Sequence, residues 1–72
     1  MNKQEKISLL EEIMDMEEGT LKEDIVLSDL DEWDSMSRLS VIVMMSDEFG
    51  KTISGEDVKK FVTVNDILEQ MN

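Results

Sequence analysis

The hydrophobic positions near the start of the chain recur at helical spacing. Between residues 7 and 16, the apolar side chains fall on one half of a helical wheel: Ile7, Leu9, Leu10, Ile13, Met14 and Met16. The polar side chains fall on the opposite half: Ser8, Glu11, Glu12 and Asp15. This pattern predicts an amphipathic helix. Gly19 is placed to end it, because glycine is common just beyond a helix C-terminus.

A second helical pattern runs from Ser35 to Phe49, and Gly50 follows it as a stop. Its apolar residues form two arcs on the wheel. One arc consists of Val41, Ile42, Met45 and Phe49, and the other consists of Met36, Leu39 and Val43. Only one arc can face the centre of a small bundle. The second arc is therefore either shielded by the rest of the chain or left exposed for a binding partner.

Two helix-start signals follow near the C-terminus. Ser54 and Asp57 have the spacing of a capping box and predict a short helix. We expect its inward-facing residues to be Val58, Phe61 and Val62. Thr63 and Asp66 repeat the signal. An apolar stripe at i, i+3, i+4 and i+7 then predicts the last helix: Val64, Ile67, Leu68 and Met71.

Residues 17–34 show no sustained period and contain eight acidic residues against one basic residue, Lys22. Their apolar residues can tie this segment to a core: Leu21, Ile25, Val26, Leu27, Leu30 and Trp33. We expect Trp33 to anchor the loop rather than to form a ligand platform. Together the patterns predict an all-α fold in a single domain, residues 1–72. Its architecture is a small four-helix bundle, with three longer helices, one short helix and a long loop after the first helix.

Charge narrows the classes of function. The 72 residues include seven Lys and Arg against 18 Asp and Glu, which gives a formal net charge of −11. This charge repels nucleic acid and anionic membrane surfaces, so we expect basic protein partners, and self-repulsion favours a monomer. The N-terminal segment interleaves acidic with apolar residues, which is typical of neither a signal peptide nor a membrane span. A cytoplasmic location is therefore expected.

The chain has no cysteine and no histidine, so it offers no disulfide and no thiolate metal ligand. This matters for Ser35, which stands where the acidic loop meets the second helix. A nucleophilic serine needs an adjacent base, and Lys59 and Lys60 lie on a distant helix, so we do not expect an enzyme. Two hypotheses remain open. Either Asp34 or Ser35 simply caps the helix, or the Ser35 hydroxyl bears a phosphate, which a helix start favours.

Several short motifs surround Ser35. Asp34-Ser35-Met36 is preceded by Ser28-Asp29-Leu30 and followed, after an apolar helix, by Asp47-Glu48-Phe49-Gly50. Thr63-Val64-Asn65-Asp66-Ile67 begins the last predicted helix. In this order, within an acidic four-helix pattern, these motifs resemble the acyl carrier protein family over nearly the whole chain.

The resemblance implies that Ser35 carries 4′-phosphopantetheine, transferred from coenzyme A by a separate phosphopantetheinyl transferase. The thiol of this arm would hold acyl intermediates as thioesters, which accounts for the missing cysteine. Asp34 matches the family's aspartate before the serine, which is expected to help the transferase hold Mg²⁺ and coenzyme A, so no metal belongs to the resting carrier. The family's partner-binding surface matches Met36, Leu39, Val43, Asp47 and Glu48.

The partners implied by the resemblance are acyl-transferring and acyl-modifying enzymes with basic docking patches. They act in fatty acid biosynthesis, and so in lipid metabolism, or in a specialised polyketide, aminoacyl or surface-polymer pathway. The second helix departs from the pattern, because Ser37, Ser40 and Ser46 stand where fatty-acid carriers commonly have acidic residues. These changes weaken the docking expected of a general fatty-acid carrier.

Arg38 is a further departure. It either pairs with one of three acidic residues, Asp29, Asp31 and Asp34, or reaches the phosphate of the arm. Calcium binding by the same three residues fails on their spacing and on the missing EF-hand glycine. The main alternative to a carrier is an acidic helical adaptor that binds a basic partner through the second helix. The two hypotheses differ at the Ser35 hydroxyl, which only a carrier needs.

Overall fold

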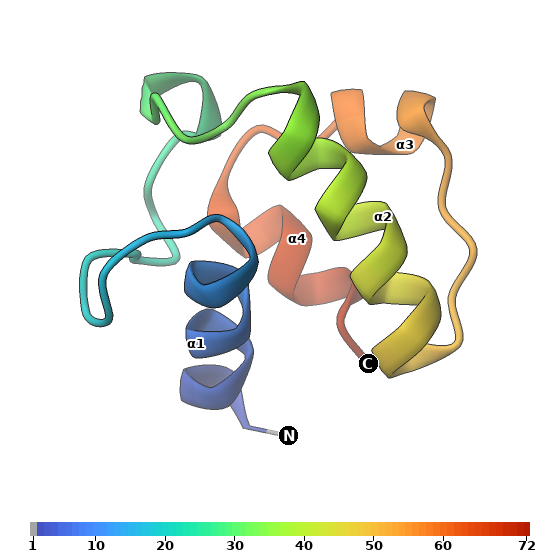
Figure 1. Ribbon diagram of the computed structural model, residues 1–72, viewed down its shortest axis with the longest axis horizontal. Coiled ribbons are helices and arrows are strands. Elements are labelled where there is room, and N and C mark those ends of the chain that lie inside the picture. The colour runs from blue at the N-terminus through green and yellow to red at the C-terminus, as the bar shows by residue number, and fades with distance from the viewer. Residues whose placement is uncertain (1) are drawn as a thin grey trace.

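The computed structural model describes residues 2–72 and shows four α-helices in that range (Figure 1). They are α1 (Lys3–Ile13), α2 (Ser35–Phe49), α3 (Gly55–Lys59) and α4 (Val64–Gln70). A short 3₁₀ helix, η1 (Leu27–Asp29), lies in the long connection between α1 and α2. The longest helix, α2, contacts both α1 and α3, and α4 packs against α1. The predicted all-α bundle with a long loop after its first helix is confirmed.

Side-chain caps fix where the helices begin. The capping boxes predicted at Ser54 and Asp57 and at Thr63 and Asp66 are both formed. A third box, between Asn2 and Glu5, starts α1. In each box the side chain before the helix accepts a first-turn N–H, and the acidic side chain in the first turn accepts an N–H in return. These local hydrogen bonds explain why the helix starts could be predicted from short sequence signals.

The end of α1 differs from the prediction. The helix stops at Ile13, and Asp15 adopts the left-handed conformation with φ of 56°. The Met16 N–H then bonds back to the Glu11 carbonyl at 2.8 Å. Aspartate is one of the few residues apart from glycine that enters this conformation at low cost. The prediction that Gly19 ends the helix is wrong, and Gly19 lies in the following turn with φ of 89°.

The core gathers one apolar face from α1, α2 and α4, together with two residues of the long loop. The buried cluster consists of Ile7, Leu10, Leu21, Leu27, Val41, Met44, Met45, Val64, Ile67, Leu68 and Met71. It contains the whole stripe predicted for α4. The inward set predicted around α3 is partly wrong. Val58 is buried and Phe61 is half-buried, but Val62 is 59% exposed because the chain has left the helix by that point.

The long loop is fixed to the start of α4. Residues 26 and 63 form an isolated antiparallel bridge. Leu27 N–H bonds to the Val62 carbonyl at 2.8 Å, and Val64 N–H bonds to the Ile25 carbonyl at 3.0 Å. Trp33 packs against the core from the last part of the loop, as expected of an anchor. The segment from Leu27 to Trp33, which leads into α2, is therefore fixed at both of its ends.

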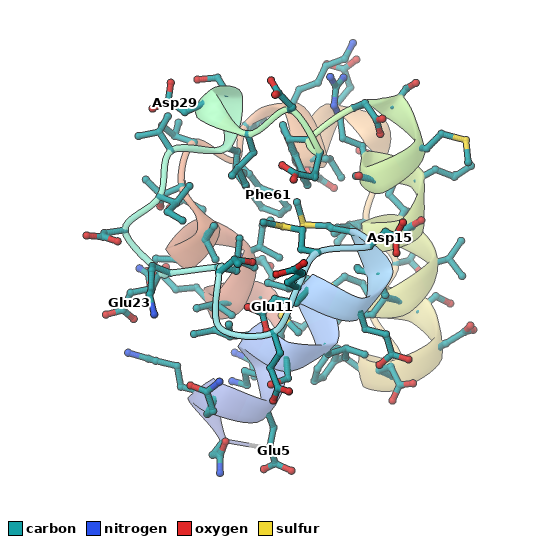
Figure 2. The ribbon with its side chains drawn as sticks, turned by 60° about the vertical axis from the view of Figure 1, so that its left-hand side comes forward. Glu5, Glu11, Asp15, Glu23, Asp29 and Phe61 are labelled. Carbon is teal, nitrogen blue, oxygen red and sulfur yellow. The ribbon has the colours of Figure 1, made fainter. Side chains whose placement is uncertain are left out.

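Glu11 holds the first part of this loop from inside. Although it lies on the half of the helical wheel assigned to polar residues, only 2% of its surface is exposed. Its Oε2 accepts hydrogen bonds from Gly19 N–H at 2.9 Å and from Leu21 N–H at 3.0 Å. Figure 2 shows Glu11 beside the loop that follows α1. The carboxylate thus replaces backbone partners that the turning loop cannot supply.

None of the helices within residues 2–72 is both long enough and apolar enough to cross a bilayer.

Candidate functional site

The start of α2 is built by Asp34. Its backbone is extended, and its Oδ1 accepts the Ser37 N–H at 2.9 Å. Its carbonyl accepts the Arg38 N–H at 3.0 Å, which closes the first helical turn. The sequence left open whether Asp34 or Ser35 caps this helix. The structure assigns the cap to Asp34, and Ser35 becomes the first helical residue.

The cap also sets the charge beside Ser35. The hydrogen bond from the Ser37 backbone N–H holds the pKa of Asp34 below its ordinary value of 3.8. The carboxylate is therefore ionised at neutral pH, at the helix end where the dipole favours a negative charge. A partner that approaches Ser35 meets a fixed anion one residue away.

The Ser35 side chain is exposed and has a free hydroxyl. No hydrogen bond within residues 2–72 engages its Oγ. The hydroxyls that precede α3 and α4 are engaged: Ser54 Oγ accepts the Asp57 N–H, and Thr63 Oγ1 accepts the Asp66 N–H. Ser35 is thus exposed, begins a helix and has an Oγ that forms no hydrogen bond in the part of the fold that the structure describes. These properties suit a hydroxyl that a separate enzyme modifies.

Ser37 points the other way. It is buried, and its Oγ donates a hydrogen bond to the Glu32 carbonyl, which joins the loop to the first turn of α2. Ser37 is also one of the three serines that stand where fatty-acid carriers commonly have acidic residues. Its buried hydrogen bond gives serine a structural use at this position. The expectation that the three serines weaken docking stays a prediction, and of the other two Ser46 is exposed and Ser40 is half-buried.

The second arc of α2 is exposed. Met36, Leu39 and Val43, here called the α2 apolar face, are 75%, 60% and 51% exposed. The hypothesis that the loop and the short third helix shield this arc is therefore wrong. Large apolar side chains left open on adjacent turns of one helix are typical of an interaction surface.

A groove between α1 and α2 continues this face. It has a volume of about 510 Å³, and its lining includes Leu39, Val43, Asp47 and Glu48. The remaining lining comes from Leu9, Glu12, Ile13, Ser40 and Met44. Four of the five residues predicted to bind partners therefore lie around one groove. The fifth, Met36, stands on the first turn of α2, outside the groove.

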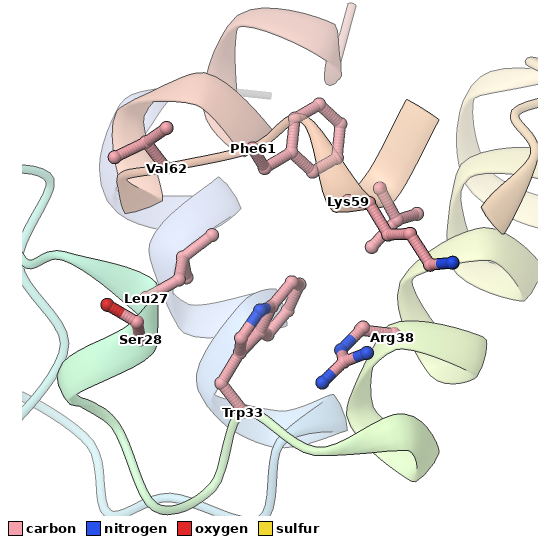
Figure 3. Close-up of a pocket in the computed structure, with 8 residues that line it drawn as sticks. Leu27, Ser28, Trp33, Arg38, Lys59, Phe61 and Val62 are labelled. Atoms are coloured by element: carbon pink, nitrogen blue, oxygen red, sulfur yellow. The ribbon is translucent and has the colours of Figure 1, made fainter. Parts of the chain in front are cut away.

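A second cavity, distinct from the groove between α1 and α2, lies between the long loop, the start of α2 and α3. The sequence did not predict it. Its volume is about 510 Å³, and it is lined by Leu27, Ser28, Trp33, Arg38, Val58, Lys59, Phe61 and Val62. Figure 3 shows Arg38 and Lys59 on one side of it, across from Leu27 and Ser28. Because its walls come from the loop, α2, α3 and the segment after α3, no single stretch of sequence contains the signal.

Arg38 does not form the ion pairs considered from the sequence. The two ion pairs within residues 2–72 join Lys3 to Glu23 at 2.6 Å and Lys59 to Glu56 at 3.7 Å. The Arg38 side chain is half-buried instead, and its Nε is buried with no hydrogen-bond partner in the described part of the chain. Its positive charge is thus turned toward the cavity beside Trp33 (Figure 3).

Comparison with known proteins gave one finding. The family model described as "Phosphopantetheine attachment site" matches residues 7–71, a range that runs from within α1 to the residue after α4. Comparison with curated proteins gave no significant match, and neither did comparison with solved structures. The acidic side chains of residues 2–72 form no cluster of three or more that could hold a metal ion.

Proposed function

The chain belongs to the family of acyl carrier proteins and carrier domains, and from this premise we propose that Ser35 bears its 4′-phosphopantetheine arm. The family's domain is the site where this group is covalently attached. The observation that carries the assignment is that Ser35 is exposed at the first residue of α2, where Asp34 and not Ser35 supplies the helix cap. Ser37, Ser54 and Thr63 all use their side-chain oxygens in the fold.

The surroundings of Ser35 suit the phosphate of the arm. The first turn of an α-helix has backbone N–H groups without intrahelical acceptors, and the positive end of the helix dipole favours an anion. A phosphate on Ser35 therefore gains electrostatic support from the start of α2, which offsets repulsion from the ionised Asp34 carboxylate.

The composition of the chain indicates which roles belong to the arm and which to the protein. When attached, the arm supplies the thiol that holds acyl groups as thioesters, and the chain itself has no cysteine. Ser35 contributes the attachment oxygen. Asp34 contributes a carboxylate that the transferase uses, with coenzyme A, to hold Mg²⁺, because that cation prefers carboxylate and phosphate oxygens. The chain presents its cargo and leaves the chemistry to partner enzymes.

We propose that these partners dock on the α2 apolar face and the groove beside it. Asp47 and Glu48 add negative charge at the end of the groove. Together with the net charge of −11, they steer enzymes that have basic patches. The expected partners are the phosphopantetheinyl transferase and acyl-transferring or acyl-modifying enzymes of fatty acid biosynthesis or a specialised pathway. A monomer in the cytoplasm fits this role, and an acidic adaptor would leave the free Ser35 hydroxyl without a use.

Loading by a transferase tests the proposal. The protein is incubated with coenzyme A, Mg²⁺ and a broad-specificity phosphopantetheinyl transferase, and its intact mass is measured. We expect one phosphopantetheine group to be added to the unaltered chain and to a Ser46→Ala variant, which removes another exposed hydroxyl of α2. Ser35→Ala should gain none. Equal loading of both variants would overturn the assignment.

A further inference from the structure

The cavity beside Trp33 differs in charge from the rest of the molecule. The chain has 18 acidic and seven basic residues, yet the lining of this cavity includes Arg38 and Lys59 and no acidic side chain. Five apolar or aromatic side chains complete most of the wall: Leu27, Trp33, Val58, Phe61 and Val62. Such a lining suits a ligand that has both an apolar part and a negative charge.

Arg38 determines which ligands the cavity tolerates. Its Nε is already buried without a hydrogen-bond partner in residues 2–72. A purely alkyl ligand would remove water from the rest of the guanidinium and offer no acceptor, which is costly for a charged group. An ammonium group would meet two like charges. A carboxylate would instead accept charge-assisted hydrogen bonds, and paired bonds to a guanidinium are among the strongest of these.

Lys59 forms only a weak ion pair, with Glu56. Its Nζ lies 3.7 Å from Glu56, and both side chains are largely exposed, so this ion pair is worth little in water. Figure 3 shows Lys59 on the same side of the cavity as Arg38, with the rings of Trp33 and Phe61 also facing the space. Lys59 is thus free to turn toward an anion held by Arg38.

The cavity begins beside the attachment point. Trp33 lies two residues before Ser35, and Arg38 lies three residues after it, on the next turn of α2. Resting on Ser35 as the attachment residue, we propose that this cavity receives the acyl group and that the preferred cargo carries a carboxylate, as in the monothioester of a dicarboxylic acid. The apolar walls cover its methylene groups, and Arg38 pairs with its free carboxylate.

Loading with matched groups separates this inference from the proposed function. A transferase attaches three coenzyme A analogues in which an amide replaces the thioester, so that each group stays in place. The groups are succinyl, which is anionic, pentanoyl, which is neutral, and 4-aminobutyryl, which is cationic. Intact mass confirms loading. The readouts are the Tm and the fluorescence of Trp33, which is the single tryptophan of the chain and lines the cavity.

We expect the succinyl form to melt above the other two by about 2–5 °C, the effect of one partly buried ion pair in a domain this small. Only the succinyl form should shift the Trp33 emission. Arg38→Gln should abolish both differences. Lys22→Gln, which removes a positive charge that lines another depression, should keep them.

The contrary outcomes are distinct. If Arg38→Gln alters all three loaded forms equally, Arg38 serves the phosphate that they share, and the inference about cargo is overturned. A larger effect of pentanoyl or 4-aminobutyryl would overturn it in favour of alkyl or aminoacyl cargo. If no group is added at all, the proposed function fails first, and the inference falls with it.

Discussion

The Asp34 carboxylate accepts the backbone N–H of Ser37 at 2.9 Å, so the residue before Ser35 caps α2 and the Ser35 hydroxyl stays free. Asp34 therefore has the structural role of helix cap, and the adjacent Ser35 is left for the proposed role of attachment residue. Ser35→Ala should therefore change the free energy of unfolding by less than about 0.5 kcal/mol, as expected for an exposed side chain without partners. Asp34→Ala should destabilise the protein, because it removes a helix cap.

Urea denaturation of the two variants beside the unaltered protein measures this difference. A large loss of stability in Ser35→Ala, with little change in Asp34→Ala, would assign the cap to the serine and remove the main argument for Ser35 as an attachment point.

The buried Glu11 carboxylate offers a second test, because it bonds two backbone N–H groups of the loop. Glu11→Ala leaves both donors without this acceptor, at a cost of about 1–3 kcal/mol for a buried group. We expect the free energy of unfolding to fall by about that amount. Glu12→Ala is the matched control on the same helix, since Glu12 is exposed, and should stay within about 0.5 kcal/mol. Similar losses in both variants would contradict the role given to Glu11.

Stability should depend on pH through the capping carboxylates. Hydrogen bonds from the Thr63 and Val62 N–H groups lower the pKa of Asp66 from its ordinary value of 3.8. A group whose pKa is lower in the folded state stabilises the fold above the unfolded pKa, and this contribution is lost as pH falls through the folded pKa. Asp66→Asn should thus be less stable than the unaltered chain at pH 7, and the difference should shrink below about pH 4.

Urea denaturation at several pH values gives this difference directly, and the overall repulsion of the acidic chain affects both proteins similarly. Glu18→Gln, at an exposed loop position, serves as the control and should show little pH-dependent difference. A difference between Asp66→Asn and the unaltered chain that grows toward acid pH would contradict the prediction.

The α2 apolar face should matter for recognition more than for folding. Leu39 is 60% exposed, so Leu39→Ala should retain most of the stability. If the transferase docks on this face, the variant should lose about tenfold in kcat/KM for loading, the effect expected of one well-packed interface residue. Ser46→Ala, on the same helix, should load normally. Unchanged kcat/KM in Leu39→Ala would place the docking surface elsewhere.

Local signals explain which parts of this fold were predictable from the sequence. The caps at Ser54 and Thr63 and the apolar stripe of α4 depend on residues within two turns of each other. Glu11 depends instead on N–H groups eight and ten residues away, in a segment without periodicity. Its position on the helical wheel therefore suggested exposure, and only the path of the loop shows why it is buried.

The site divides in the same way. Ser35 and Asp34 belong to a short motif that can be recognised in the sequence, and the α2 apolar face follows from helical spacing. Whether that face is covered depends on the path of the rest of the chain, so the sequence left it open. The cavity beside Trp33 combines residues 27 to 62 from separate elements. Only the folded chain brings Arg38 and Lys59 to one wall.

Fragmentation mass spectrometry of the transferase-treated protein locates the residue to which the arm is attached. We expect the phosphopantetheine group on Ser35 in every modified molecule. Modification at another hydroxyl, such as Ser28 or Ser40, would contradict it.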